Sequence, residues 1–164
     1  MPFIQQQRVR IAANEQVNWL REARERALIE QKTITICPIS RGEERVCGDS
    51  WDAPQMMFVD ENSNREREEN EELIRILPSF SSDIHLEWRG APPVQYIKAM
   101  PIFSTRAYNG TFRFCLDGNP EVNRAIVINR QGRIRASKDT NNNQIHELIR
   151  SGEVEEPIQC QAES

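Results

Sequence analysis

Residues 3–30 carry apolar side chains at every third or fourth position, which is the spacing of one face of an α-helix. The repeating positions are Val9, Ala13, Val17, Leu20, Ala23 and Ala27. Arginine and glutamate side chains occupy the opposite face, and the narrow, alanine-rich stripe lets a helix lie close against a flat sheet. We expect one helix over about 3–30, roughly 40 Å long, with an N-terminal half that overhangs the domain.

From residue 33 onward the pattern changes to the alternation that is typical of β-strands. The clearest segments are Ile84–Trp88, Thr111–Leu116 with Phe112, Phe114 and Leu116 facing inward, and the apolar runs Met56–Val59 and Ala125–Ile128. Further strand candidates are 33–36, 94–97, 101–103 and 133–136, while 73–77 fits either a strand or a helical turn. A hairpin turn is expected at 129–132 and loops at 38–52 and 60–72. The prediction is an α+β fold, a long N-terminal helix packed on antiparallel sheets of short strands.

The chain has 164 residues, which suits one domain. We place the globular domain at 1–138 and a polar C-terminal tail at 139–164, with one helical turn near 145–149. Charged residues make up 28% of the chain and the net charge is -4, which excludes a wholly basic surface but not a local basic patch. No run of about 18 apolar residues and no signal peptide is visible in this sequence.

Four cysteines, Cys37, Cys47, Cys115 and Cys160, allow three pairings, and the sequence alone does not choose among them. The simplest arrangement joins Cys37 to Cys47 across a short polar loop and Cys115 to Cys160, which ties the tail to the body. Four buried, reduced cysteines are the alternative. Zinc is not favoured, because no CxxC pair occurs and the two histidines are far apart in the sequence.

The sequence offers no catalytic constellation. His85 lies on an alternating strand, and neither His85 nor His146 has a nucleophile motif around it. No glycine-rich phosphate loop occurs either. We therefore predict no catalytic residue, no enzymatic activity and no cofactor.

The acidic loop after residue 59 partly matches a calcium-binding template. Asp60, Asn62, Asn64 and Glu71 fall at its positions 1, 3, 5 and 12. Arg65 stands where that template needs glycine for a sharp turn. We favour a solvated run of charges and predict no metal site.

A basic cluster near the end of the domain is the sharper signal. Five positively charged residues lie within 15 positions, with no acidic residue between them. They are Arg124, Arg130, Arg133, Arg135 and Lys138. Arg133 and Arg135 are two apart on a predicted strand and would point the same way. The planar fork of arginine suits phosphate, and the absence of an interleaved aromatic favours contact with backbone phosphates over base reading.

A competing interpretation of this cluster is a solvated hairpin whose arginines pair with acids of the tail, namely Glu153, Glu155 and Glu156. From charge alone this interpretation is the stronger. Arg8, Arg10 and Lys32 could extend a basic track, although helix arginines more often pair within their helix.

Several motifs follow one another between residues 9 and 136. They are LREARERALIEQKTITICP at Leu20–Pro38, Cys47 with Trp51, FVDENSN at Phe58–Asn64, GTF at Gly110–Phe112 before Cys115, and Ile126–Ile128 followed by GRIR at Gly132–Arg135. In this order they resemble the FimT, FimU and GspH group of type IV minor pilins and pseudopilins, and FimT most of all.

The resemblance implies a type IV pilin-like fold and a set of partners. FimT-like pilins use a GRxR region to bind DNA in natural transformation, which implies binding of double-stranded DNA through Arg133 and Arg135, helped by Arg130, Lys138 and Arg124. It also implies contacts with other pilins through the N-terminal helix. FimU-like relatives are structural parts of the pilus tip and GspH-like relatives serve type II secretion, so these roles stay open.

The same resemblance implies a location. The group begins with a prepilin leader and a hydrophobic helical half, neither of which is in this sequence, and Phe3–Gln7 looks like the point where that half ends. We expect a periplasm-facing protein that the absent segment anchors in the inner membrane before it enters the extracellular pilus. The present sequence would be its water-soluble part.

Overall fold

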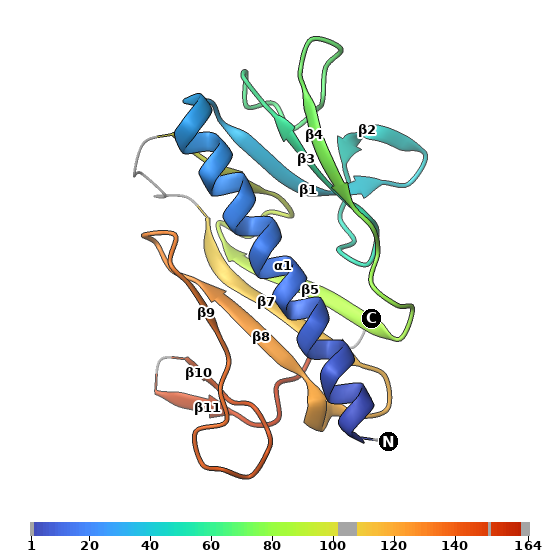
Figure 1. The fold of residues 1–164 in the computed structure, drawn as a ribbon, viewed down its shortest axis with the longest axis vertical. Coiled ribbons are helices and arrows are strands. Elements are labelled where there is room, and N and C mark those ends of the chain that lie inside the picture. The colour runs from blue at the N-terminus through green and yellow to red at the C-terminus, as the bar shows by residue number, and fades with distance from the viewer. Residues whose placement is uncertain (1, 102–107, 151, 162–164) are drawn as a thin grey trace.

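The computed structural model describes residues 2–101, 108–150 and 152–161 (Figure 1). The chain begins with a helix of 29 residues, α1 (Pro2–Glu30). The strands that follow are β1 (Ile34–Ser40), β2 (Glu43–Cys47), β3 (Gln55–Val59), β4 (Leu73–Leu77), β5 (Ile84–Ala91), β6 (Ile97–Ala99), β7 (Asn109–Leu116), β8 (Arg124–Ile128), β9 (Ile134–Ala136), β10 (Leu148–Arg150) and β11 (Glu153–Glu155). A 3-10 turn, η1 (Pro120–Val122), precedes β8.

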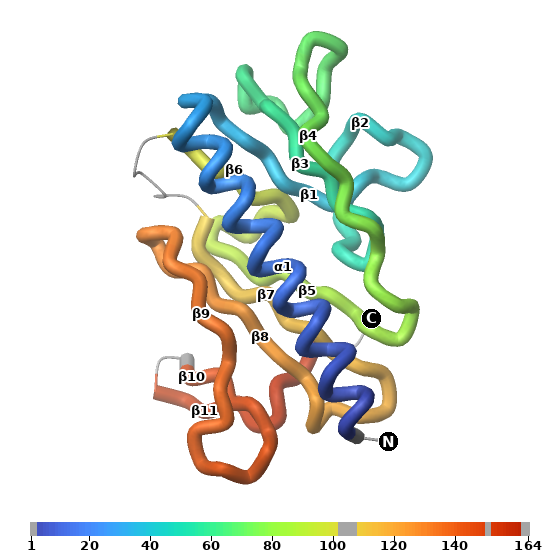
Figure 2. The backbone as a smooth tube through the Cα atoms, in the orientation of Figure 1, coloured from blue at the N-terminus to red at the C-terminus, as the bar shows by residue number. Residues whose placement is uncertain are grey.

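The strands form two sheets and a separate hairpin. The first sheet has the order β2-β1-β3-β4, with β6 also paired to β1, and the second has the order β5-β7-β8-β9. All neighbouring strands are antiparallel. The helix α1 lies across both sheets (Figure 2), in contact with β1 and β6 of the first and with β7, β8 and η1 of the second. The helix therefore joins the two sheets into one core, which confirms the predicted α+β arrangement.

The helix packs along nearly its whole length, so the expected overhang is wrong. Val9 is fully buried, and Asn119, next to η1, donates a hydrogen bond from Nδ2 to Oε1 of Gln5 at 2.9 Å. The second sheet extends far enough to cover the N-terminal half of α1. No described helix has both the length and the apolar character that crossing a bilayer requires.

The buried face of α1 is broader than the predicted stripe. Ala12, Gln16 and Trp19 are also buried. The amide groups of Gln16 and Gln55 exchange two hydrogen bonds, at 3.0 and 2.7 Å, between the helix and β3. These hydrogen bonds offset the free-energy cost of burying two polar side chains in the core.

The strands of the first sheet correct several predictions. β1 continues through Pro38, and β2 pairs back on it, so the expected loop over 38–52 holds a hairpin. Gly42 makes the turn with a φ of +85°, a conformation that favours glycine. The segment 73–77 is a strand, and of 94–97 only Ile97 is part of β6. Residues 102 and 103 of the strand expected at 101–103 lie outside the described residues.

The C-terminal segment forms part of the core. Instead of the helical turn expected near 145–149, β10 and β11 form a hairpin. Leu148 and Ile158 pack on Ala125 against the face of the second sheet that points away from α1. Every residue of β7 from Thr111 to Leu116 is buried, and not only the alternate ones that were predicted. The C-terminal segment contributes to this burial at Arg113 and Cys115, through Glu155 and Cys160.

Two disulfides connect the elements, with the pairs that the spacing favoured. Cys37 is joined to Cys47 with Cα atoms 5.5 Å apart, and Cys115 to Cys160 with Cα atoms 6.1 Å apart. The first closes the β1–β2 hairpin. The second fixes the C-terminal segment across β7.

Candidate functional site

The turn between β8 and β9 is a rigid structure that the GRIR motif builds. Oδ1 of Asn129 accepts hydrogen bonds from the backbone N–H groups of Gln131 and Arg133, at 3.0 and 2.9 Å. Gly132 has a φ of +78°, and its N–H donates to the carbonyl oxygen of Asn129 at 2.9 Å. The glycine of the motif is therefore a conformational requirement, because other side chains are strained in this region.

The helix holds this turn and adds two arginines to it. Nη1 of Arg24 donates to the carbonyl oxygen of Gly132 at 3.0 Å. Arg21, Arg24 and Arg133 line one hollow of about 410 Å³, which we call the basic hollow. Its other lining residues are Gln131, Gly132 and Ile134, so no acidic side chain lines it. Three guanidinium groups without an acid among them create a positive local field on a chain of net charge -4.

The predicted pair Arg133 and Arg135 does not share one side of a strand. β9 begins only at Ile134, so Arg133 belongs to the turn and lines the basic hollow. Arg135 is exposed and lies opposite Val127, on the sheet face that points away from α1. The strand period therefore does not apply across both residues. Arg130 and Lys138, at the turn and beyond the far end of β9, are both exposed.

Arg124 differs from the other members of the cluster. It starts β8, opposite Phe114, at the end of the strand remote from the turn. Its side chain is partly buried, and burial followed by the charge of Arg10 lowers its pKa. Nη1 of Arg124 is buried without a hydrogen-bond partner among the described residues. Arg124 therefore adds to the positive electrostatic field of the cluster, but its partly buried side chain is poorly accessible to a ligand.

Two acids of the tail, Glu155 and Glu156, are bound to residues outside the cluster. Glu155 is paired with the buried Arg113 at 2.8 Å, and Glu156 accepts hydrogen bonds from Asn141 and Asn143. Within the described ranges, no ion pair joins a tail carboxylate to Arg133, Arg135 or Lys138. The competing interpretation, in which the tail neutralises the hairpin, therefore finds no support in these contacts.

The helix arginines of the basic hollow were missed by sequence reasoning, which named others. Arg8 is instead paired with Asp83, and Lys32 with Glu61 at 3.2 Å. Arg21 and Arg24 are three apart on the polar face of α1, which is a detectable signal. Their approach to the turn depends on how α1 is rotated on the sheet.

The acidic loop after β3 uses its carboxylates for its own backbone. Asp60 is buried and accepts hydrogen bonds from Thr35, Asn64 and Arg65 at 2.8, 3.1 and 3.2 Å. Glu71 is also buried and accepts from backbone N–H groups at 2.9 and 3.1 Å. The loop is thus an ordered structure, unlike the solvated run that we favoured. The residues described include no group of three or more His, Cys, Asp or Glu that could hold a metal ion.

The two histidines have opposite electrostatic environments. Nδ1 of His85 lies 2.9 Å from Asp52 and Nε2 lies 3.0 Å from Asp117, so only the protonated ring can donate to both carboxylates. The hydrogen bond to Asp52 raises the pKa of His85, against the opposing effect of burial. Burial, and then the charge of Arg124, lower the pKa of His146.

These shifts predict a stability maximum near the ordinary histidine pKa of 6.5. The raised pKa of His85 gives stability that is present below 6.5 and is lost as the pH rises through the folded-state value. The lowered pKa of His146 gives stability that is present above 6.5 and is lost as the pH falls. Urea unfolding between about pH 5.5 and 8.5 should show both declines. His85→Gln should flatten the alkaline side and His146→Gln the acidic side, and the reverse assignment would contradict the geometry.

The fold defines the class of protein: a long helix laid across antiparallel sheets of short strands is the architecture of type IV pilins. A family model described as Type II transport protein GspH matches residues 12–132. The chain therefore belongs to the GspH family, and the predicted resemblance to the minor pilin and pseudopilin group is confirmed.

Solved structures agree with this assignment. Two crystal structures of the type IV minor pilin FimU of Pseudomonas aeruginosa are similar to this chain. The first has a TM-score of 0.63 at 18% identity and covers 84% of this chain and 93% of FimU. The second has a TM-score of 0.59 at 17% identity, with 79% and 92% covered. At these identities the likeness shows the fold. No curated protein matches the chain, and the closer kinship with FimT stays a prediction.

Proposed function

We propose that this minor pilin of the GspH family binds double-stranded DNA through the basic hollow and supports DNA uptake in natural transformation. The observation that carries the proposal is the convergence of Arg21, Arg24 and Arg133 on one hollow that no acid lines. Guanidinium groups bind phosphate through paired, charge-assisted hydrogen bonds. Because no aromatic side chain lines the hollow, the contact is with the phosphate backbone and has no sequence preference.

The other basic residues extend this surface in the proposal. In the proposal, Arg130 at the turn and Lys138 beyond the far end of β9 continue the basic surface. Arg135 contacts phosphate on the outer side of β9, and Arg124 adds to the field from its partly buried position. The net charge of -4 opposes a polyanion, so a single domain binds weakly. Several copies along a filament would raise the effective affinity through avidity.

The proposal also includes assembly and location. Phe3, Ile4 and Ile11 are exposed apolar residues on α1, with 69%, 57% and 56% of their surface accessible, and they suit contacts with helices of other pilins. A hydrophobic segment ahead of α1 would anchor the protein in the inner membrane before assembly. The globular part would face the periplasm and later the outside of the pilus.

The DNA contact is tested by titration of duplex DNA across a range of salt concentrations. If three or four phosphates are neutralised, the logarithm of affinity should fall with the logarithm of salt at a slope of about -3. Arg133→Gln with Arg135→Gln should weaken binding by about tenfold at low salt and make the slope shallower by about 1 to 2. Thermal unfolding should be unchanged, because both side chains are exposed.

A matched control is available in the first sheet. Arg41→Gln with Arg45→Gln removes the same charge from the exposed β1–β2 hairpin. This control should leave DNA binding nearly intact. Equal losses in the two double variants would mean that only net charge matters, and an unaffected Arg133/Arg135 variant would refute the assignment of the site.

A structural role without DNA binding is the second candidate, and the FimU-like fold favours it. In that role the protein is a component of the pilus tip or of a type II secretion pseudopilus. Failure of the isolated domain to bind DNA even at low salt would select it.

A further inference from the structure

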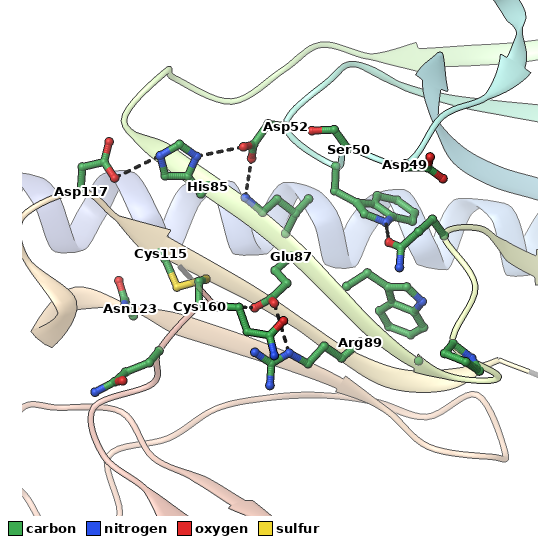
Figure 3. Close-up of a pocket in the computed structure, with 18 of the residues that line it drawn as sticks. Asp49, Ser50, Asp52, His85, Glu87, Arg89, Cys115, Asp117, Asn123 and Cys160 are labelled. Atoms are coloured by element: carbon green, nitrogen blue, oxygen red, sulfur yellow. Dashed lines mark hydrogen bonds and ion pairs between the residues drawn. A yellow bond between two sulfur atoms is a disulfide. The ribbon is translucent and has the colours of Figure 1, made fainter. Parts of the chain in front are cut away.

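β5, one of the two edge strands of the second sheet, borders a groove that the DNA proposal does not use (Figure 3). Among the described residues, β5 pairs with β7 on one side only. Six successive residues of β5, from His85 to Gly90, line this groove of about 1110 Å³. Because neighbouring residues of a strand point to opposite faces, a groove that touches all six runs along the free edge of the strand. We call it the β5 groove.

The hydrogen bonds of β5 show which main-chain groups face the groove. The N–H of Ile84 donates to the carbonyl oxygen of Ser81 at 2.9 Å, and the N–H of Leu86 donates to Oδ1 of Asp52 at 2.7 Å. Both therefore point away from β7. By the two-residue period of an antiparallel ladder, the N–H and C=O groups of Trp88 and Gly90 point the same way. Asp52 caps the edge at Leu86, and no main-chain hydrogen bond among the described residues closes the stretch beyond it, which suits the addition of a strand.

A buried donor without a partner lies at the same place. Trp88 is 3% exposed and lines the groove, and its Nε1 has no hydrogen-bond partner among the described residues. A Cβ atom on Gly90 would lie 2.6 Å from that Nε1, so only glycine leaves room for the indole at this position. Nearby, Nε1 of Trp51 is satisfied by Gln95 at 2.7 Å. A buried indole N–H normally has an acceptor, and a peptide carbonyl in the groove would supply one.

The charge of the groove points to a basic occupant. Four carboxylates line it, those of Asp49, Asp52, Glu87 and Asp117, against the cationic groups of Arg89 and His85. Figure 3 shows the Asp52, His85 and Asp117 side chains in a row and Glu87 turned toward Arg89, with Nε of Arg89 3.1 Å from Glu87. Asp49 is exposed at the rim. The excess of carboxylates complements lysine or arginine side chains.

We propose that the β5 groove binds an extended, basic segment of a partner protein as an added strand. Its main chain pairs with Trp88 and Gly90, one of its carbonyl groups accepts the hydrogen bond of the Trp88 indole, and its basic side chains face the acidic rim. Addition at the free edge would satisfy the buried donor and cover the open edge of the sheet.

The test uses the ¹⁵N-labelled protein and the acetylated, amidated peptide Lys-Thr-Val-Thr-Val-Thr-Lys. Saturable amide shifts and slowed exchange are expected at Trp88 and Gly90, with a shift of the Trp88 indole signal. The same peptide with N-methyl groups on alternate residues cannot form the ladder and should bind at least tenfold more weakly. A peptide with Glu in place of both Lys residues should also bind more weakly.

Two variants address the groove itself. Asp49→Lys reverses an exposed rim charge and should weaken binding at least threefold, whereas Glu153→Lys makes the same change on exposed β11 and should not. Trp88→Phe should abolish the indole contribution. Because it changes a core residue, the Asp49 comparison carries the test if that variant does not fold. Equal binding of the N-methylated peptide, shifts confined to other surfaces, or pairing of two copies through β5 without peptide would overturn the proposal.

Discussion

Replacing Cys115 and Cys160 together with serine is expected to lower the free energy of unfolding by about 4 kcal/mol. The two cysteines are 45 residues apart in the sequence, and cross-linking so long a loop restricts the unfolded chain strongly. The folded state also depends on this link. It holds the segment in which Ile158 is buried against Ala125 and Glu155 is paired with Arg113. Loosening this segment would expose the outer face of the second sheet.

The matched control is the other disulfide. Cys37→Ser with Cys47→Ser opens a loop with a sequence separation of 10, which the same chain-entropy relation values at about 3 kcal/mol. Urea unfolding followed by circular dichroism gives both values. Limited proteolysis should release the C-terminal segment only from the Cys115/Cys160 variant. A smaller loss there than in the Cys37/Cys47 variant would mean that the C-terminal cover adds little to the stability of the body.

The local sequence pattern was sufficient to predict several elements of the fold. Ile84–Trp88 alternates because one face of β5 packs on the core and the other is more exposed. The helix was predicted for the same reason, and the turn at 129–132 because Asn129 and Gly132 have local conformational roles. In each case the signal itself, a periodic run of apolar side chains or a turn motif, lies within one short segment of the sequence, although the core that buries the helix and the strand is built from distant segments.

Contacts between distant segments were not predictable in this way. Thr111, Arg113 and Cys115 form what should be the solvent side of β7, yet all three are buried. The C-terminal segment crosses this side of the strand, where Glu155 pairs with Arg113 and Cys160 is bonded to Cys115. Nothing in the local pattern of β7 encodes that cover. The buried pair of Gln16 and Gln55 is similar, because each glutamine is acceptable in the core only when the other is opposite it.

The candidate DNA site shows both situations. The high density of basic residues between Arg124 and Lys138 can be read from the sequence, and it was enough to predict that the site lies at the β8–β9 turn. Which arginines converge depends on the rotation of α1, because Arg24 reaches Gly132 across 108 positions of the chain. The strand period was applied one residue too early, so Arg135 was grouped with Arg133 although the structure places them differently.

Gly110→Ala is expected to lower the free energy of unfolding by about 3 kcal/mol, at the upper end of the usual cost of overpacking. Gly110, in the GTF motif, lies directly opposite Gly90 in the β5–β7 ladder. A Cβ atom there would collide with the carbonyl oxygen of Arg89 and would lie 2.7 Å from Cα of Gly90 and 2.8 Å from Cη2 of Trp88. The two nearest atoms are backbone, so relief requires opening the ladder and not merely turning a side chain.

A companion variant separates the backbone clash from the ring contact. Trp88→Phe in the Gly110→Ala background removes Cη2 but leaves the Arg89 carbonyl in place, so it should recover little of the lost stability in a double-mutant cycle. Asn109→Ala, one position earlier on β7, should change stability by only about 0.5 kcal/mol. Full recovery in the double variant would identify the indole as the constraint. An unaltered free energy of unfolding for Gly110→Ala would show that β5 and β7 can separate at this end of the ladder. The proposed addition of a strand to β5 depends on the two strands staying paired there.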